Sequence, residues 1–480
     1  MSSERKPDRG RGVLEPSGAE MRRLVEESMD RLVHHVESLP DQKLTYAETP
    51  GEIARSLVEP LPGEGRPLAE LLDLLFDRAI PASYNAASPG YLGYVPGGGI
   101  FASAVGDLIA AATNRFTGML AAAPGLGQLE VNVVRWFTEI VGFPDTTRGV
   151  LTSGGSLAAF SAVVTARRER LGEDFLSGTL YVSDQTHHTL GKAAVLAGFP
   201  AGNVRTVPSD DAFRIDVDAL RRMISEDRRR GRTPFLVSGN AGTVHTGAVD
   251  PLHTLAGVAR DEGLWFHVDG AYGAFFMLTE HGRRTLDGLS LADSLVLDPH
   301  KGLFIPYGTG ALLVRDGAAL RRAHTFEAGY LPEVQEDPDL VDFHLHSPEL
   351  SRHARGLRVW LPLSLYGIGP WRDALDEKLR LARWMADALR ELDPVRVVAE
   401  PELSLLAFRV EPTGWSAAET DRLNRRVLEL VNRRNRVLLT GTTSGGRFLI
   451  RVCVLSVRTH RERLEMARDD VRSAISEALG

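Results

Sequence analysis

Cysteine is almost absent from this sequence of 480 residues, and long hydrophobic runs are missing altogether. The one cysteine, Cys453, has no second cysteine with which to form an intramolecular disulfide. No apolar run reaches the ~18 residues that a membrane-spanning helix needs, and residues 1–12 lack the apolar core of a signal peptide. These absences predict a cytoplasmic protein that does not cross a membrane.

An excess of positive charge is also missing. Lys and Arg number 56 against 63 for Asp and Glu, which gives a formal net charge of −7. This balance gives no electrostatic reason to expect nucleic acid or an anionic membrane as a partner. The remaining composition is ordinary for a soluble globular protein with a sizeable core, since 43% of the residues are hydrophobic and 25% are charged. We therefore expect small-molecule partners.

The N-terminal residues divide into a polar tail and a helix. Residues 1–16 are rich in Arg, Lys, Gly and Pro, a composition typical of a disordered tail. Ser17 and Glu20 have the spacing of a capping box, and apolar residues at helical spacing continue from there to Val36, shortly before Pro40. The apolar face of this predicted helix could pack on its own domain or on a partner subunit, and the periodicity alone favours neither.

The middle of the chain alternates short β-branched segments with longer amphipathic ones. This alternation predicts an α/β fold with a mostly parallel, buried sheet and helices on both of its faces. Ligands of such a sheet bind at the carboxyl ends of the strands. Past about residue 367, long charged helices and two strands predict a smaller α+β domain. The predicted strands are 149–152, 179–183, 204–207, 235–238, 264–269, 294–297, 311–314, 404–410 and 448–454, and the predicted helices include 157–170, 252–262, 372–392 and 417–433.

The sequence Asp-Pro-His-Lys at 298–301 places a lysine directly behind one of these strands. A lysine by itself is far more often a solvated surface group. An amine must lose its proton before it can attack an aldehyde, and desolvation at the end of a buried strand favours the neutral form. This context makes Lys301 a candidate nucleophile with a neutral amine.

A second buried strand leads into Asp269, within the sequence His-Val-Asp-Gly-Ala-Tyr at 267–272. A buried carboxylate requires a cationic or hydrogen-bonding partner. A pyridinium nitrogen would supply one, and the carboxylate would keep that nitrogen protonated. The alternative is an Asp that caps the turn after the strand, which would be the better interpretation if Lys301 were absent.

The sequence Thr-Ser-Gly-Gly-Ser at 152–156 lies between a predicted strand and a predicted helix. Glycines let backbone N–H groups approach a ligand closely, a helix N-terminus favours an anion, and Ser156 can donate its hydroxyl. Gly154, Gly155 and Ser156 are therefore a candidate phosphate cradle, although such a turn in isolation is more often a plain loop.

Two adjacent histidines, His187 and His188, follow the strand predicted at 179–183. An imidazole here could stack on a planar cofactor ring and donate a hydrogen bond to a substrate carboxylate. A lone histidine is more often structural. Adjacent side chains point in different directions and no third ligand stands at a recognised spacing, so we predict no metal site.

Taken in order, these segments resemble the group II pyridoxal-phosphate (PLP) decarboxylases, the family of aromatic-L-amino-acid, glutamate, histidine and diaminobutyrate decarboxylases. The resemblance extends from about residue 21 to the end of the chain. Its most specific marks are 183–187, 267–272, 298–301 and the sequence Gly-Arg-Phe-Leu-Ile-Arg-Val-Cys at 446–453. The resemblance implies a fold-type I PLP enzyme, similar in fold to aspartate aminotransferase, that decarboxylates an L-amino acid as a homodimer.

The resemblance also implies roles for single residues. Lys301 is similar to the lysine that holds PLP as a Schiff base, Asp269 to the partner of the pyridinium nitrogen, and His187 to the histidine that stacks on the ring. Tyr330, in the candidate lid at 325–348, resembles the loop tyrosine that returns a proton to Cα, so that the product is an amine. The other implied cofactor contacts are Gly154, Gly155, Ser156, Thr243, Asp298 and His300.

The implied substrate pocket is formed by two segments. Residues 88–96 resemble the family's substrate entry, and residues 114–130 resemble the segment that crosses the dimer interface. Gly97 and Gly118 are smaller than the residues that aromatic-specific relatives carry, and Val244 lacks a hydroxyl that many relatives have, so that the pocket could be enlarged or specific for another substrate. The implied pocket residues are Tyr94, Pro96, Gly97, Phe116 and Gly118, with Tyr94 and Phe116 as stacking surfaces.

An aromatic L-amino acid is the favoured substrate. The alternatives are a non-aromatic acidic or diamino acid, an aldehyde synthase that couples decarboxylation to oxidation, an aminotransferase, and a regulatory protein that binds PLP without turnover. By resemblance the N-terminal helix packs on the other subunit. We expect a tail (1–16), an N-terminal helical dimerisation segment (17–95), a large PLP-binding domain (96–366) and a small C-terminal domain (367–480).

Overall fold

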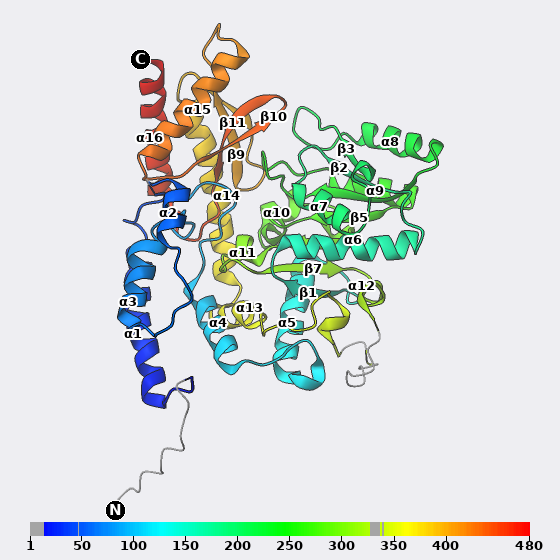
Figure 1. Ribbon diagram of the computed structural model, residues 1–480. Coiled ribbons are helices and arrows are strands. Elements are labelled where there is room, and N and C mark those ends of the chain that lie inside the picture. The colour runs from blue at the N-terminus through cyan, green and yellow to red at the C-terminus, as the bar shows by residue number, and fades with distance from the viewer. Residues whose placement is uncertain (1–13, 47, 327–336, 338–339) are drawn as a thin grey trace, which may run out of the picture.

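The computed structural model describes residues 14–46, 48–326, 337 and 340–480. Two sheets organise these residues, a large one at the right of Figure 1 and a small one at its upper left. None of the helices in this part of the chain is long and apolar enough to cross a membrane. Tyr330 and part of the candidate lid at 325–348 lie outside the described residues.

The large sheet has seven strands. They are β1 (Arg148–Thr152), β2 (Gly178–Ser183), β3 (Val204–Val207), β4 (Thr233–Asn240), β5 (Trp265–Asp269), β6 (Ser294–Leu297) and β7 (Gly310–Val314). Their order is β1-β7-β6-β5-β4-β2-β3, and every pair is parallel except those that β7 makes with β1 and β6. The predicted mostly parallel sheet is confirmed, and the carboxyl ends of β2, β4, β5 and β6 meet at one edge.

Helices cover both faces of the large sheet. Consecutive strand residues alternate between two hydrophobic cores, since Val150 and Leu151 face opposite cores, as do Leu236 and Val237. This explains why the strands read as continuous apolar runs. One core contains α6 (Gly155–Leu171), α7 (His188–Leu196) and α12 (Gly317–His324), and the other contains α5 (Pro124–Val141), α8 (Val217–Arg229) and α9 (Leu252–Glu262).

The C-terminal residues form a separate core around a four-stranded antiparallel sheet of order β10-β11-β9-β8. Its strands are β8 (Val395–Ala399), β9 (Leu405–Val410), β10 (Thr440–Ser444) and β11 (Arg447–Cys453), and its helices are α14 (Gly369–Arg390), α15 (Ala417–Arg433) and α16 (Arg461–Leu479). The sequence predicted β9 and β11 but not β8 and β10. The two missed strands lie at the sheet edges, where partial exposure weakens the hydrophobic pattern.

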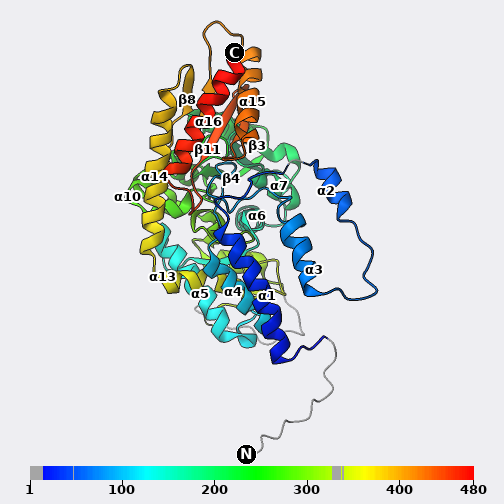
Figure 2. The ribbon, with the colours of Figure 1, turned by 90° about the vertical axis from the view of Figure 1, so that its left-hand side faces the viewer.

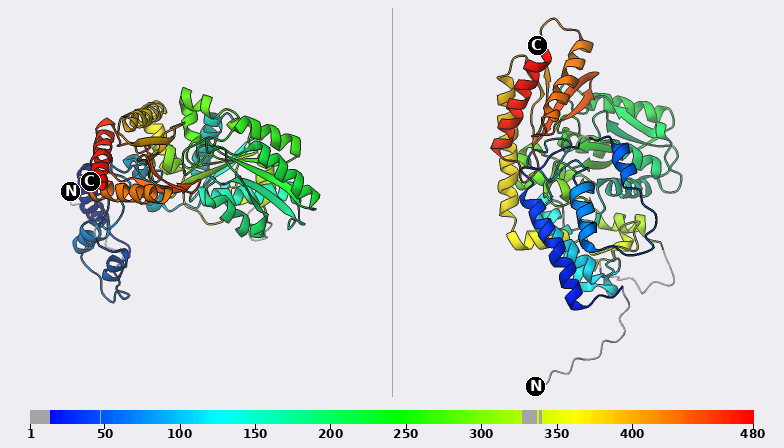
Figure 3. Two further views of the ribbon diagram at one scale, coloured as in Figure 1. Left: turned by 90° about the horizontal axis from the view of Figure 1, so that it is seen from above. Right: turned by 60° about the vertical axis from the view of Figure 1, so that its left-hand side comes forward.

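The N-terminal helices stand away from both sheets, as Figure 2 and the view from above in Figure 3 show. They are α1 (Gly18–Glu37), α2 (Pro50–Ser56) and α3 (Leu68–Asp73). The next helix, α4 (Phe101–Thr113), belongs to the body of the molecule. The remaining α-helices are α10 (Glu280–Thr285), α11 (Pro299–Gly302) and α13 (Leu357–Tyr366). Ser17 Oγ accepts the Glu20 N–H at 3.2 Å, so the predicted helix start is confirmed. No residue of α1 is buried in the single chain. The domain limits themselves stay a prediction.

Candidate active site

A cavity of about 450 Å³ opens at the carboxyl ends of β4, β5 and β6. This is the edge at which a parallel sheet is expected to bind ligands. Folding brings together side chains that lie far apart in the sequence. The predicted site residues that line the cavity are Tyr94, Gly154, Gly155, Ser156, His187, Asp269, Asp298, His300 and Lys301.

Lys301 lies in α11, a single turn that follows β6. Its Nζ lies 2.8 Å from Oδ2 of Asp298, whose side chain is almost fully buried. Burial lowers the pKa of Lys301, but the charge and hydrogen bond of Asp298, together with the charge of Asp269, outweigh burial and raise that pKa above its ordinary value. The expectation of a neutral amine is therefore wrong, because the strand ends supply carboxylates as well as desolvation.

Asp269 is the last residue of β5. Its Oδ1 accepts a 3.1 Å hydrogen bond from the Ala271 N–H, which is the turn-capping contact that the sequence left open. The residue is half-buried and lines the cavity, so the carboxylate remains accessible to a ligand. Turn capping occupies Oδ1 and leaves Oδ2 for a cationic partner.

The candidate phosphate cradle is the start of α6. This helix has no side-chain cap, so its first backbone N–H groups have no side chain to accept from them, and Gly155 and Ser156 line the cavity. A Cβ on Gly155 would lie 3.0 Å from Asp298 Oδ2, and one on Gly310 would lie 2.4 Å from the backbone of Gly154. The backbone approach makes glycine necessary at position 310, and a side chain at position 155 would crowd Asp298. A helix start with free N–H groups stabilises an anion.

His187 is the N-cap residue of α7. Its Nδ1 accepts the Thr189 N–H at 3.3 Å and lies 2.5 Å from Thr189 Oγ1. Because Nδ1 accepts, the neutral ring carries its proton on Nε2. Burial is the main cause that lowers the pKa of His187, aided by the nearby His188 and Lys301, so the neutral form is favoured.

His300 precedes Lys301 in α11 and also lines the cavity. Its Nδ1 donates to the Thr309 carbonyl at 2.6 Å, and its ring centroid lies 5.4 Å from that of Tyr307. Burial lowers the pKa of His300, which leaves a neutral ring with Nε2 as an acceptor. Tyr94 and Tyr307 are both largely exposed and line the same cavity, so the mouth is aromatic.

Of the predicted site residues that the structure describes, five do not line this cavity: Pro96, Gly97, Phe116, Gly118 and Thr243. The Thr243 hydroxyl instead bonds to Thr246 Oγ1 at 3.0 Å, although its neighbours on either side reach the cavity. A Cβ on Gly97 would lie 2.0 Å from the His300 carbonyl oxygen, and one on Gly118 would lie 2.4 Å from that of Leu350. Both glycines therefore permit close backbone approach, and neither enlarges this cavity.

A family model described as the pyridoxal-dependent decarboxylase conserved domain matches residues 50–411. The chain belongs to this family. Among the relatives of this decarboxylase are an aromatic-L-amino-acid decarboxylase of Bacillus atrophaeus, 32% identical over 94% of both chains, and tryptophan decarboxylase TDC1 of Camptotheca acuminata, 30% identical over 92% of this chain and 90% of the relative.

Solved structures agree with this assignment. The crystal structure of Oryza sativa TDC with PLP and tryptamine matches the decarboxylase with a TM-score of 0.92 and 25% identity, over 97% of this chain and 99% of the other. The structure of Rhodiola rosea 4-hydroxyphenylacetaldehyde synthase matches with a TM-score of 0.87 and 25% identity, over 96% and 98% of the two chains. The fold is that of fold-type I PLP enzymes.

The cofactor of this family is PLP, and the cavity of the decarboxylase fits it. The uncapped start of α6 suits the phosphate, the Lys301 amine suits the aldehyde, and Asp269 suits the ring nitrogen. His187 lies in the same cavity as these groups. Among the residues that the structure describes, no group of three metal-ligating side chains comes together.

Sequence reasoning did not single out several residues that line the cavity of the decarboxylase. Asn240 ends β4 and donates to Thr186 Oγ1 at 3.1 Å, while Arg451 projects from β11 of the small sheet. His267 lies two positions before Asp269, and the period of a strand would have put both on one face. No pattern in the sequence around Tyr307 indicates that this residue lines the cavity.

Proposed function

We propose that this decarboxylase removes the α-carboxylate of an aromatic L-amino acid as carbon dioxide and releases the amine, with PLP held on Lys301. The main support for the proposal is that Lys301, Asp269 and His187 line one cavity. The aromatic rings of Tyr94 and Tyr307 line the same cavity. The names of the relatives favour aromatic substrates. On the sequence grounds given above, we also propose that it acts in the cytoplasm.

The residues of the cavity have distinct tasks in this proposal. PLP, when bound, supplies an electron sink for the bond that breaks at Cα. Lys301 must give up a proton before its amine can bind the cofactor, and the Asp298 carboxylate, whose Oδ2 lies 2.8 Å from Nζ, opposes that loss. Asp269 would hold a proton on the ring nitrogen, and His187 would lie against the ring and donate from Nε2. Tyr330 would return a proton to Cα.

Arg451 supports an amino-acid substrate. Its guanidinium is buried and donates to Thr440 Oγ1 at 3.3 Å, and among the described residues it has no carboxylate partner. A buried cation of this kind favours a ligand that brings a negative charge. It would attract the carboxylate of a substrate into the cavity. The side-chain carboxylate of an acidic amino acid could bind to it in the same way. This leaves an acidic substrate as the second candidate.

The homodimer is part of the proposal. Large apolar side chains are exposed on two N-terminal helices: Met21, Leu24, Val25, Leu32 and Val33 on α1, and Phe101, Leu108 and Ile109 on α4. A single chain rarely leaves so many apolar groups uncovered on adjoining elements. Phe116 and Gly118, which do not reach the cavity of their own chain, would then serve the cavity of the partner.

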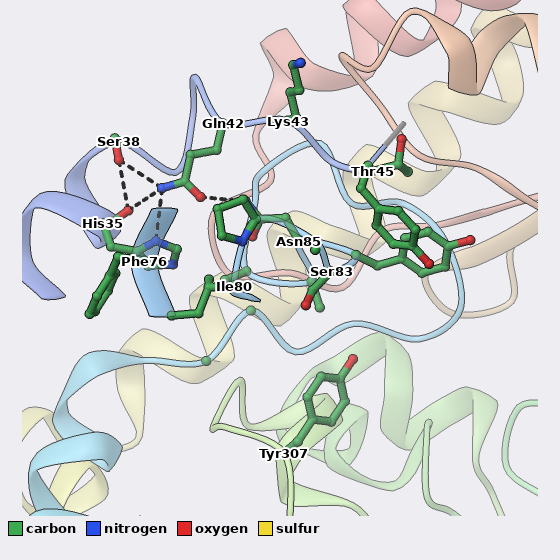
Figure 4. Close-up of a pocket in the computed structure, with 18 of the residues that line it drawn as sticks. His35, Ser38, Gln42, Lys43, Thr45, Phe76, Ile80, Ser83, Asn85 and Tyr307 are labelled. Carbon is green, nitrogen blue, oxygen red and sulfur yellow. Dashed lines mark hydrogen bonds between the residues drawn. The ribbon is translucent and has the colours of Figure 1, made fainter. Parts of the chain in front are cut away.

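A second cavity of about 910 Å³ adjoins this surface. In Figure 4, Gln42 bonds to His35, Ser38 and Asn85 on the N-terminal side, while Tyr307 lies across from them on the body. His300 and Tyr307 line both cavities, so the second cavity leads toward the first. A partner subunit placed here would close the route to the lysine.

The alternative product is an aldehyde. It deserves a test because one structural relative is an aldehyde synthase. In the family resemblance a tyrosine at position 330 goes with amine formation, and this position lies outside the described residues. An intact Tyr330 therefore supports the amine by sequence alone.

One screen separates these candidates. The purified protein with PLP is incubated with L-tryptophan, L-tyrosine, L-phenylalanine, L-glutamate and L-2,4-diaminobutyrate, while carbon dioxide, amine, aldehyde and oxygen uptake are followed. We expect amine and carbon dioxide in equal amounts from an aromatic substrate. Release from glutamate or diaminobutyrate alone would reject the aromatic assignment, and aldehyde with oxygen uptake would reject the amine. Absence of release from every substrate would favour a PLP-binding protein without turnover.

A further inference from the structure

His267 lies on the same face of β5 as Asp269. The side chains of β5 alternate between the two hydrophobic cores of the large sheet. Trp265 packs in the core with α6, whereas Phe266 and Val268 pack in the core on the opposite face. His267 is fully buried and lines the cofactor cavity. Two residues along a strand span about 6.6 Å, which makes Asp269 the next side chain of that face toward the cavity.

The protonation of His267 follows from its neighbours. Trp265 Nε1, which can only donate, donates to Ser294 Oγ at 2.8 Å. The Ser294 hydroxyl is buried, and its one further partner among the described residues is His267 Nδ1 at 2.9 Å. The hydroxyl proton must therefore go to Nδ1. Burial also lowers the pKa of His267, so the ring is neutral and carries its own proton on Nε2.

The Nε2–H has no acceptor in the described part of the chain, although it is buried. A buried donor without an acceptor is costly, which indicates that a partner is present in the working enzyme. Asp269 is the carboxylate whose charge acts on His267, and its Oδ1 is already used by the Ala271 N–H. Its Oδ2 is not used by that contact, and Asp269 follows His267 on the same face of the strand.

We propose that His267 is a positioning residue whose Nε2–H donates to the Asp269 carboxylate when PLP is bound. A carboxylate enclosed by a ligand loses water, and loss of water favours its protonated form. The histidine N–H replaces that water and keeps Asp269 ionised, so that the ring nitrogen retains its proton. The proposal rests on PLP binding at this site and does not depend on which amino acid is decarboxylated.

Two substitutions separate this role from packing. His267→Leu removes the donor at similar volume, and His267→Gln places an amide N–H near the position of Nε2. Ser238→Ala is the matched control, because Ser238 of β4 pairs with His267 in the sheet and its buried hydroxyl makes no hydrogen bond in the described part of the chain. Each variant is loaded with PLP labelled with ¹⁵N at the ring nitrogen, without substrate, and the nitrogen shift is followed against pH.

In the parent enzyme we expect a protonated ring nitrogen throughout and His267 with its proton on Nε2. His267→Leu should make that nitrogen lose its proton about 10- to 100-fold more readily, which is the usual effect of one hydrogen bond to a charged group. His267→Gln should restore most of the difference, and Ser238→Ala should match the parent.

Three results would overturn the proposal. They are a His267→Leu profile identical to that of the parent, an equal shift in Ser238→Ala, or, in the parent enzyme labelled with ¹⁵N-histidine, a His267 proton on Nδ1. The last measurement uses the unaltered enzyme, so it decides the matter even if His267→Leu fails to bind PLP. Because no substrate is present in this experiment, a failure of the His267 proposal would not bear on the decarboxylation proposal. The substrate screen tests that proposal separately.

Discussion

Asp298 lies between Lys301 and the start of α6. Its Oδ2 is 2.8 Å from Lys301 Nζ, and a Cβ added to Gly155 would come within 3.0 Å of the same oxygen. A phosphate at this helix end would therefore approach a carboxylate, which is unfavourable if that carboxylate stays charged. The same carboxylate holds the Lys301 ammonium, so Asp298 opposes the loss of the lysine proton that cofactor capture requires.

This arrangement predicts the pH dependence of PLP capture. Asp298 raises the pKa of Lys301, so the protonated amine persists to higher pH and capture should accelerate as pH rises from neutral to alkaline. Asp298→Asn should lower that pKa and speed capture at neutral pH, about tenfold for each unit by which the pKa falls. Stopped-flow absorbance with the cofactor-free enzyme measures the rate.

The control for this experiment is pyridoxal, which lacks the phosphate. If Asp298 acts on the amine, Asp298→Asn accelerates capture of pyridoxal as well as of PLP. An acceleration limited to PLP would mean that Asp298 acts only on the phosphate. If the pH profile of capture in Asp298→Asn equals that of the parent, Asp298 affects neither the amine nor the phosphate.

Asp269→Asn should retain PLP and lose most turnover. The amide cannot hold a proton on the ring nitrogen, so a loss of about 100- to 1,000-fold in kcat is expected, the usual cost of removing one preorganised electrostatic group. Absorbance of the bound cofactor and carbon dioxide release are measured together. Asp261→Asn, on an exposed side chain at the end of α9, is the control. A variant that binds PLP and turns over at the parent rate would refute the ring-nitrogen role.

The sequence predicted the large sheet and the cluster of cavity residues well, and the reasons are local. Strands such as β6 and β7 are short apolar runs between clear turns. Asp269 ends a strand, and Lys301 and His187 each follow one. Parallel strands bring such positions to one edge of the sheet. The grouping of these residues in one site could therefore be predicted once the strands were known.

The remaining features depend on contacts between distant segments. Nothing local indicates that Gly97 must be small because it abuts the His300 carbonyl, or that the Thr243 hydroxyl turns to Thr246. The charged state of Lys301 was missed because Asp298 raises its pKa against desolvation, and this balance depends on a distance. Arg451 lay within a recognised motif, but its side-chain direction required the fold. The period of β5 could have placed His267 on the face of Asp269, so that residue was missed although the sequence held the signal.

Tyr330→Phe should change the product and leave cofactor binding intact. Without the hydroxyl, the protonation of Cα slows, and oxygen can react before the proton arrives. We expect less amine and more aldehyde, ammonia and oxygen uptake, measured by product chromatography with an oxygen electrode. Tyr307→Phe, at the cavity mouth, is the matched control and should still give amine. Parent-like products from Tyr330→Phe would show that another group donates the proton.

Val25→Asp should weaken the proposed dimer. Val25 lies on the exposed apolar face of α1, with 44% of its surface exposed in the single chain. A charge buried there by a partner would raise the dimer dissociation constant by about tenfold or more. Sedimentation velocity over a range of concentrations, with activity measured in parallel, detects the change. Glu26→Gln on the same helix should leave the dimer intact, whereas a fully active monomeric parent would contradict the cross-subunit arrangement.

The covalent attachment of PLP to Lys301 is the central claim, and reduction with borohydride followed by peptide mapping tests it most directly. The chain has five lysines: Lys6, Lys43, Lys192, Lys301 and Lys378. Of these, Lys378 is already engaged with the Thr459 carbonyl and Glu377, and Lys43 lines the second cavity. The account predicts a yellow protein whose pyridoxyl group is found, after reduction, on the peptide containing Lys301. A pyridoxyl group on any other lysine, or on none, would contradict it.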